Sequence, residues 1–395
     1  MRFDLKLIGD YVEVISGYAF KSEWFGIGHD KVIRIGDLKN EKIDTNNALT
    51  ISANDNKISA TYKIKEKDIL IALSGATVGK IAFAEKKDEE SYINQRVAIV
   101  RCKENIEANY LKHFFYGKYL DELLKSAGGA AQPNLSPKQI SLMKIPLPPL
   151  SEQKRIAEIL DKADELRQKR QQSIEKLDEL LQTTFIDMFG DPVTNPNKHK
   201  TDILANYVLK DFQNGLYKPA SFYGSGTPIL RIDGYRNGDI INESNFKRLE
   251  LEPSEIEKYK LTKMDLVINR VNSPEYLGKI ALFMDDREDT VFESNMMRFS
   301  IRQELLNVYY LIFLFKQRYI SNQIATKRKD AVNQSSINQQ DVKSLILNVP
   351  NTKLQNKWAE LYQSCNMQKK ILTSQLNQQE NLFKSLQQRA FNGEL

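Results

Sequence analysis

The sequence predicts an α+β protein in which two tandem mixed α/β domains are joined and separated by two long helices, and these helices pair as an antiparallel coiled coil. Two observations support this prediction. The second half of the chain repeats the first half in step, and each half ends in a long segment with one apolar stripe at helical spacing. With 395 residues, of which 41% are hydrophobic, the chain is large enough for two or more domains with real cores.

The repeat is visible in short motifs that return at an offset of roughly 200 residues. Ile-Arg-Ile at 33–35 returns as Leu-Arg-Ile at 230–232. Val-Gly-Lys-Ile-Ala at 78–82 returns as Leu-Gly-Lys-Ile-Ala at 277–281. The offset drifts by only a few residues over the whole chain, and chance similarity would not stay in register over that distance.

The two globular domains are expected at residues 1–147 and 192–348. Each mixes strand-like runs with some helix. Thr-Tyr-Lys-Ile-Lys at 61–65 alternates like a strand, whereas residues 108–125 carry apolar side chains at helical spacing. The matching helix of the second copy is expected near 308–324.

The two long helices are expected within residues 148–191 and 349–395. In the first copy a proline-rich run precedes Ser151, a good N-cap, and Gly190 is a stop signal. These limits define a helix of roughly 38 residues, about 57 Å long. The second helix is expected from about Thr352. One apolar stripe of this length cannot stand alone in water, so pairing of the two helices is favoured over docking of each helix on its own domain.

The run Ser-Gly-Ala-Thr-Val-Gly-Lys at 74–80 raises the question of a phosphate-binding loop. The strict pattern has four residues between the glycines and a Ser or Thr after the lysine. Here three residues separate the glycines, and Ile81 follows the lysine. The twin segment at 270–279 has lost the first glycine. The sequence therefore favours a tight turn between two strands, which is the ordinary use of such glycines.

Composition narrows the function classes further. Two cysteines and three scattered histidines form no metal or disulfide framework. We find no signal peptide and no apolar run long enough to cross a membrane, so a cytoplasmic protein without a membrane partner is expected. A net charge of +6 permits binding to a polyanion.

Three stretches resemble the specificity (S) subunits of type I restriction–modification systems. The most specific is Pro-Leu-Pro-Pro-Leu-Ser-Glu-Gln-Lys-Arg-Ile at 146–156, which resembles the start of the family's conserved helix. Gly-Tyr-Ala-Phe-Lys at 17–21 resembles the opening of the first domain, and Arg-Ala-Phe-Asn-Gly-Glu-Leu at 389–395 resembles the family's tail. The resemblance covers essentially the whole chain. It departs at Asn-Val-Pro-Asn, 348–351, which replaces the proline-rich run in the second copy.

This resemblance implies a non-catalytic subunit that reads double-stranded DNA. Each globular domain would be a target recognition domain for one half of a split, asymmetric site. The paired helices would act as a spacer and as the docking surface for two methyltransferase subunits, and restriction subunits would complete the complex. The chain itself would hold no cofactor. S-adenosylmethionine, ATP and magnesium are expected on the partner subunits.

The residue chemistry agrees with this interpretation. We find no glycine-rich cofactor turn followed by an Asn/Asp-Pro-Pro-aromatic motif and no nuclease-like carboxylate cluster. Base readout uses Arg, Lys, Asn and Gln, and phosphate contacts use basic and hydroxyl side chains. The candidate DNA-binding residues are Lys21, Ser74, Thr77, Lys80, Gln132 and Asn134 in the first copy, and Lys218, Arg236, Arg270, Asn272, Lys279, Lys327, Arg328, Lys329 and Asn333 in the second.

Alternative interpretations remain for several features. Arg34 and Arg231 lie in strand-like runs and are expected to pair with acidic neighbours. Tyr18, Phe20 and Trp24 are better explained by core packing than by stacking on DNA. At the level of the whole chain, a duplicated protein-binding scaffold without specific DNA readout, or an enzyme whose motifs are not recognisable, would be the alternatives. Salt-dependent DNA binding and methyl transfer by the chain alone would distinguish them.

Overall fold

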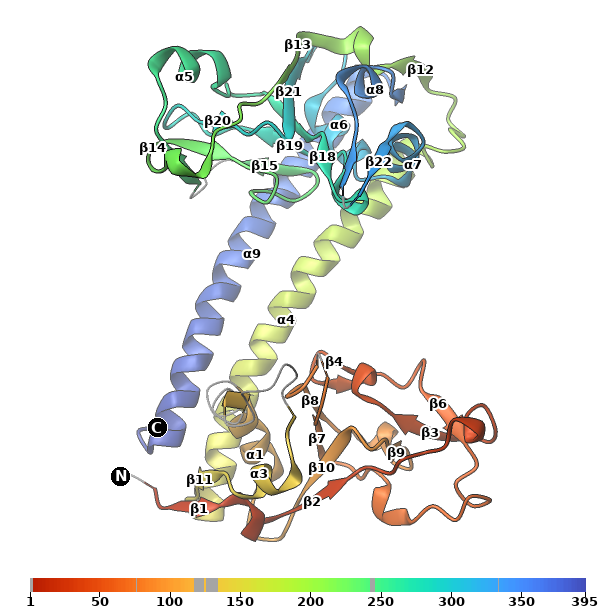
Figure 1. The fold of residues 1–395 in the computed structure, drawn as a ribbon, viewed down its shortest axis with the longest axis vertical. Helices are drawn as coiled ribbons and strands as arrows, with labels where there is room; N and C mark the ends of the chain where they lie inside the picture. The colour runs from red at the N-terminus through yellow and green to blue at the C-terminus, as the bar shows by residue number, and fades with distance from the viewer. Residues whose placement is uncertain (1–2, 76, 117–123, 126–133, 242–245, 333) are drawn as a thin grey trace. The chain divides into compact units, whose positions relative to one another are not determined.

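The structure is a computed structural model of residues 1–395 (Figure 1), and it describes all of them except 1–2, 76, 117–123, 126–133, 242–245 and 333. The chain forms two compact units. Unit 1 comprises Met1–Ser173 together with Leu372–Leu395, and unit 2 comprises Ile174–Ile371.

The centre of unit 1 is a four-stranded antiparallel sheet in the order β2-β10-β7-β8. Its two middle strands are apolar runs in which Val97–Val100 and Ile69–Ala72 are buried, as expected for strands covered on both faces. One face packs on helices, and the other packs on a smaller sheet, β6-β3-β9. The strands of unit 1 are β1 (Leu5–Leu7), β2 (Val12–Ser16), β3 (Asp30–Ile33), β4 (Leu38–Lys39), β5 (Lys42–Ile43), β6 (Leu49–Ile51), β7 (Ile69–Ala72), β8 (Ile81–Phe83), β9 (Tyr92–Ile93), β10 (Val97–Cys102) and β11 (Lys144–Pro146). The short helices that have described bounds are α1 (Ala108–Phe115) and α3 (Pro137–Ser141).

Unit 2 repeats this plan. Its largest sheet has the order β13-β21-β17-β19-β15, and β16-β14-β20 forms a second sheet. The strands are β12 (Lys200–Ile203), β13 (Val208–Asn214), β14 (Tyr223–Leu230), β15 (Asp239–Ile241), β16 (Lys247–Leu249), β17 (Leu266–Asn269), β18 (Val271–Asn272), β19 (Ile280–Phe283), β20 (Val291–Phe292), β21 (Met296–Ile301), β22 (Lys329–Ala331), β23 (Gln334–Ser336) and β24 (Ile346–Val349). The helices are α5 (Pro253–Tyr259), α6 (Val308–Leu314), α7 (Arg318–Lys327) and α8 (Gln339–Lys343).

The duplication predicted from the sequence is confirmed by the topology. The order β2-β10-β7-β8 in unit 1 corresponds to β13-β21-β17-β19 in unit 2, with antiparallel pairing throughout. A parallel pair also recurs, β3 with β9 in unit 1 and β14 with β20 in unit 2, and unit 2 adds a second parallel pair, β15 with β19. Among the described residues, the three-stranded sheet β18-β23-β22 occurs in unit 2 without a three-stranded counterpart in unit 1.

The long helices are α4 (Leu150–Phe189) and α9 (Thr352–Asn392), close to their expected limits. In unit 1, Arg155 on α4 donates to the carbonyl of Leu395 at 2.8 Å, and Arg170 donates to Gln375. In unit 2, Lys369 contacts Asp178 at 2.6 Å. The Phe185 ring of α4 also lies 5.1 Å from the Trp358 ring of α9, centre to centre. In each unit residue numbers therefore rise along one helix as they fall along the other, so the two helices pair antiparallel, as predicted.

Three local predictions were wrong or incomplete. Residues 61–65 do not form a strand, because Ser59 caps a short 3-10 helix at Ala60–Tyr62. The helix expected at 108–125 ends at Phe115, where Tyr116 adopts an extended backbone, and residues 117–123 lie outside the described part of the chain. The helix expected at 308–324 is broken into α6 and α7 at Gln317, whose buried amide bonds to Gln182 of α4 at 2.9 Å.

Candidate nucleic-acid interface

The loop at 74–80 is the turn between antiparallel strands β7 and β8, as the sequence predicted. Gly75 and Gly79 have φ of +85° and +80°, which is the left-handed region that favours glycine. The backbone N–H groups of Val78, Gly79 and Lys80 donate to carbonyl oxygens of the same turn or of β7, at 2.9 to 3.1 Å. These N–H groups are therefore engaged within the hairpin and do not form a phosphate cradle.

Most of the described candidates of unit 1 gather at this turn. Ser74 pairs with Asn134 in an antiparallel bridge, and the N–H of Leu135 donates to the carbonyl of Leu73 at 2.8 Å. Lys80 is exposed. The buried Thr77 hydroxyl has no hydrogen-bond partner among the described residues.

One other described candidate of unit 1, Lys21, does not lie at this turn. The Lys21 ammonium lies 5.4 Å from the centre of the Trp24 ring, in a separate aromatic cluster. Phe20 of that cluster is buried, which confirms the expectation of core packing for this residue. Gln132 lies outside the described residues.

In unit 2 the structure brings Asn272 and Lys329 into one small sheet, with Arg270 directly before β18 and Lys327 and Arg328 directly before β22. The N–H of Ile337 donates to the carbonyl of Arg270 at 2.9 Å, so this edge is built as the 73–135 edge is in unit 1. Strand β23 lies between β18 and β22, with Ser336 opposite both Val271 and Lys329. Residues separated by about sixty positions in sequence therefore meet at one surface. Asn333 lies outside the described residues.

The basic run is partly engaged with its own unit. Lys327 donates to the Ser344 hydroxyl at 2.9 Å, and Arg328 pairs with Asp330 at 3.0 Å. Lys329, on the fully exposed strand β22, is exposed. Lys327 and Arg328 are half-buried, so Lys329 is the member of the run that is exposed on the small sheet.

Two lysine candidates are held more tightly than sequence reasoning could reveal. The Lys279 ammonium donates to the carbonyl of Ile232 at 2.9 Å and lies 4.6 Å from the Tyr235 ring centre. Burial lowers the pKa of Lys279. Lys218 pairs with Glu255 at 2.8 Å. These contacts give both lysines a structural role, which the sequence interpretation did not include.

Arg34 and Arg231 pair with acidic neighbours, as expected. Arg34 lies 3.6 Å from Asp37, and Arg231 lies 3.6 Å from Asp233 and 3.8 Å from Glu293. Burial raises the pKa of Glu293. The remaining candidate, Arg236, is exposed on the turn before β15.

A hollow of about 390 Å³ in unit 2 contains residues that sequence reasoning missed. Tyr217, Lys247 and Asn295 line it together with Lys218 and Arg231. Tyr217 is 78% exposed, and exposed aromatic and basic groups are the chemistry that nucleic-acid surfaces use. The sequence repeat was the signal that could have located this hollow. Gly215, two residues before Tyr217, matches Gly17, and each glycine lies close to the backbone of a facing segment of its own unit.

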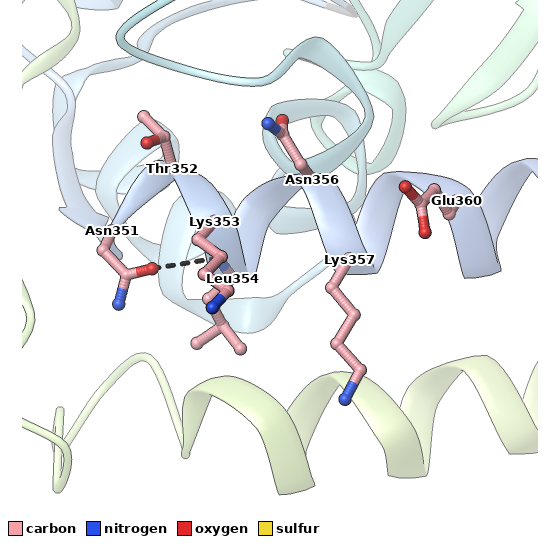
Figure 2. A pocket seen from close by; sticks show the side chains of 7 residues that line it. All are labelled: Asn351, Thr352, Lys353, Leu354, Asn356, Lys357 and Glu360. Carbon is pink, nitrogen blue, oxygen red and sulfur yellow. Dashed lines mark hydrogen bonds between the residues drawn. The ribbon is translucent and has the colours of Figure 1, made fainter.

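A second hollow, of about 760 Å³, follows the first turns of α9 (Figure 2). Its labelled residues all belong to the start of this helix, and Asn351 caps the helix by accepting from the N–H of Leu354 at 2.9 Å. Lys353, Lys357 and Glu360 give it a mixed charge. Among the residues with described positions, no group of three His, Cys, Asp or Glu could hold a metal ion, and no helix is both long and apolar enough to cross a membrane.

Fold and surface together define a class of duplicated α+β proteins in which each copy carries part of a long antiparallel helix pair and a polar, basic loop surface. Comparisons with known proteins narrow this class. A family model described as type I restriction modification DNA specificity domain matches residues 3–176.

Two curated relatives match nearly the whole chain. The type I restriction enzyme EcoKI specificity subunit of Escherichia coli K12 is 27% identical, over 92% of this chain and 82% of the relative. The StySPI specificity subunit of Salmonella potsdam is 25% identical over the same shares.

A crystal structure of a type I restriction–modification S subunit from M. genitalium has the same fold. It superposes with a TM-score of 0.59 at 12% identity, covering 99% of this chain and 96% of that one. The chain is thus similar over nearly its whole length to specificity subunits of type I restriction–modification systems, and residues 3–176 match the DNA specificity domain of that family.

Proposed function

We propose that this chain is the non-catalytic DNA-recognition subunit of a type I restriction–modification complex and that it reads a bipartite, asymmetric target. Residues 1–147 and 192–348 each serve as the recognition domain for one half-site. The observation that carries the proposal is one shared strand order with different residues at the matching edge, Ser74 opposite Asn134 in unit 1 and Val271 opposite Ser336 in unit 2. Two domains that share one framework but differ in their edge residues are suited to recognising two different DNA half-sites.

The charge and donor chemistry of these edges suits DNA. Arginine and lysine recognise guanine and phosphate, and asparagine recognises adenine, so Asn272 and Lys329 on one small sheet supply both kinds of contact. Arg270 lies directly before β18, where its guanidinium donates to the carbonyl of Ser294 at 3.1 Å. The engaged lysines, Lys218 and Lys279, support the fold around this surface instead. Catalysis, together with S-adenosylmethionine, ATP and magnesium, is assigned to the partner subunits.

The long helices are proposed as the docking surface for two methyltransferase subunits, which restriction subunits then join. Large apolar side chains remain exposed along both helices, which fits a surface that another protein covers. They are Leu166 and Leu382 in unit 1, and Leu180, Met367 and Ile371 in unit 2. Segments 148–191 and 349–395 would combine this docking role with that of a spacer between half-sites.

The test is reconstitution with the methyltransferase subunits of the same system. The complex is expected to bind a specific duplex with strong salt dependence and to methylate both halves of a split motif. The isolated chain is expected to transfer no methyl group from S-adenosylmethionine. A chain that assembles with these subunits but gives the complex no sequence preference would be a protein scaffold, and methyl transfer by the pure chain would make it an enzyme.

A further inference from the structure

The β22–β23 hairpin of unit 2 carries an apolar residue at its tip. Val332 is 93% exposed, more than any other large hydrophobic residue in the described part of the chain. A single exposed apolar side chain is ordinary on a protein surface. The position is unusual, however, because tight hairpin turns favour Gly, Asn and Asp, and a β-branched valine brings no turn-forming advantage.

The hairpin has a firm base. Ser335 is buried, and its hydroxyl donates to Asp330 at 2.5 Å across the two strands. Ile337, directly after β23, is also buried and is tied to Arg270 by a backbone hydrogen bond of 2.9 Å. Every residue of β22 is exposed. The base of the hairpin is thus anchored, and its outer strand and Val332 are presented to solvent.

The surroundings of the tip are basic. Lys327, Arg328 and Lys329 lead into the hairpin, and Arg270 precedes the neighbouring strand β18. The acidic residue within the hairpin, Asp330, is engaged by Arg328 at 3.0 Å and by Ser335. A hairpin that is positively charged where it joins the domain and apolar at Val332 is complementary to a polyanion that has an apolar group at the bottom of a groove.

Double-stranded DNA offers that combination in its major groove. The groove admits a two-stranded β-ribbon, its rims are phosphates, and the 5-methyl group of thymine is the apolar group on its floor. A valine side chain presents two methyl groups of matching character, whereas a hydroxyl or amide would favour other base edges.

We propose that the β22–β23 hairpin enters the major groove of the half-site read by unit 2, and that Val332 contacts the 5-methyl group of a thymine there. The proposal rests on the proposed function and adds to it the element, the groove and the base feature that are read. Arg328 and Lys329 then face the phosphates that border the groove.

The experiment uses the complex reconstituted with its methyltransferase subunits and the target found by mapping methylated sites. Each thymine of the unit 2 half-site is replaced in turn by deoxyuridine, which lacks only the 5-methyl group. For the wild-type complex, one such replacement is expected to weaken binding by about fourfold, the effect of one buried carbon. With Val332→Ser or Val332→Asn, thymine and deoxyuridine at that position are expected to bind equally, because these side chains carry no methyl group to contact the 5-methyl group.

The control is Val193→Ser, the same substitution at another exposed valine of unit 2, 61% exposed. It is expected to keep the wild-type sensitivity to deoxyuridine. The proposal is overturned if the half-site holds no A·T pair, if no replacement affects the wild-type complex, or if the Val332 variants remain as sensitive as the wild type. A complex that shows no preference for any duplex would instead overturn the proposed function, so the two failures can be told apart.

Discussion

Gln153 accepts a hydrogen bond from the backbone N–H of Glu107 at 2.9 Å, and its amide donates to the carbonyl of Pro148 at 2.9 Å. The side chain is 1% exposed. Glu107 is the N-cap of α1, so this glutamine ties the first turn of α4 to the first turn of α1.

Gln355 repeats the arrangement in unit 2. It accepts from the N–H of Asn307, the N-cap of α6, and donates to the carbonyl of Pro350, both at 2.7 Å. Two independent copies of one buried contact indicate that it fixes each long helix to its own globular part.

Replacing either glutamine by alanine should loosen only its own unit. A buried N–H left without an acceptor costs about 1–3 kcal/mol. In Gln153→Ala the amides of α1 are expected to exchange faster with solvent deuterium, while those of α6 keep their protection, and Gln355→Ala should give the reverse. Gln378→Ala, at an exposed position of α9, is the control and should change neither. Equal loosening of both units by one substitution would contradict this assignment.

Arg101 and Asp68 form a buried ion pair in unit 1. Two guanidinium nitrogens reach the carboxylate at 2.7 and 2.9 Å, and Asp68 is 2% exposed. Arg101→Met should destabilise unit 1 by about 3–5 kcal/mol, because it leaves a buried carboxylate unpaired. Urea unfolding followed by exchange of the β7 and β10 amides measures this decrease in stability.

An exposed pair of similar geometry serves as the control. Arg248 binds Glu288 at 2.7 and 2.9 Å, with both side chains nearly half exposed. Arg248→Met should cost less than about 1 kcal/mol. If both substitutions had the same effect, burial would not be what makes the Arg101–Asp68 pair important.

Neutralising the basic run should change the salt dependence of DNA binding. Removing one lysine or arginine that binds a phosphate lowers the slope of log affinity against log salt by about one. The triple change of Lys327, Arg328 and Lys329 to Gln is therefore expected to weaken binding and to flatten this slope. An unchanged slope would assign the run to a solvated face.

The matched control changes Lys65, Lys86 and Lys87 to Gln. These exposed lysines lie at the other end of β7 and β8 from the 74–80 turn. They are expected to leave the slope unaltered. A comparable drop in both triple variants would show a general effect of net charge rather than direct binding of phosphate by the basic run.

The length of the helices should set the gap between half-sites. Four extra residues add about 6 Å, nearly two base pairs, and turn a helix by only about 40° beyond a full turn. The two helices contact each other on both sides of the unit boundary, through Arg170 with Gln375 and Asp178 with Lys369. The same four-residue insertion must therefore be made in both helices, after Arg170 in α4 and before Gln375 in α9, to give a matched variant.

The methylated motif of the matched variant is the measurement. It should keep both half-sites and lengthen the gap by about two base pairs, whereas a four-residue insertion in α4 alone should lose activity because the pairing slips. An active matched variant that recognised the original gap would show that these helices do not measure DNA.

The long helices and the duplication were predictable because their signals are local and strong. The proline-rich run, the stop at Gly190 and the apolar stripes placed both helices to within a few residues. The Gly79 turn was predictable for the same reason, because a glycine between two apolar runs has few other uses. The missed strand at 61–65 had an alternating pattern, but the cap from Ser59 outweighed it.

The surface was less predictable, since it depends on contacts between distant segments. Nothing near Lys279 in the sequence indicates that the carbonyl of Ile232 holds its ammonium. Likewise, the break at Gln317 depends on Gln182, which lies in another element. The small sheet that joins Asn272 to Lys329 required the pairing register, which the sequence does not specify.

Exchanging the recognition domain of unit 2 tests the central claim most directly. The ends of segment 192–348 lie together, because Asn348 donates to the carbonyl of Pro192 at 2.7 Å. This segment can therefore be replaced by that of a relative with a different target while both helices are kept. The methylated motif of the reconstituted hybrid is then mapped. We predict that one half-site changes to that of the relative while the other half-site and the gap stay the same; a change in both half-sites would contradict independent reading by the two units.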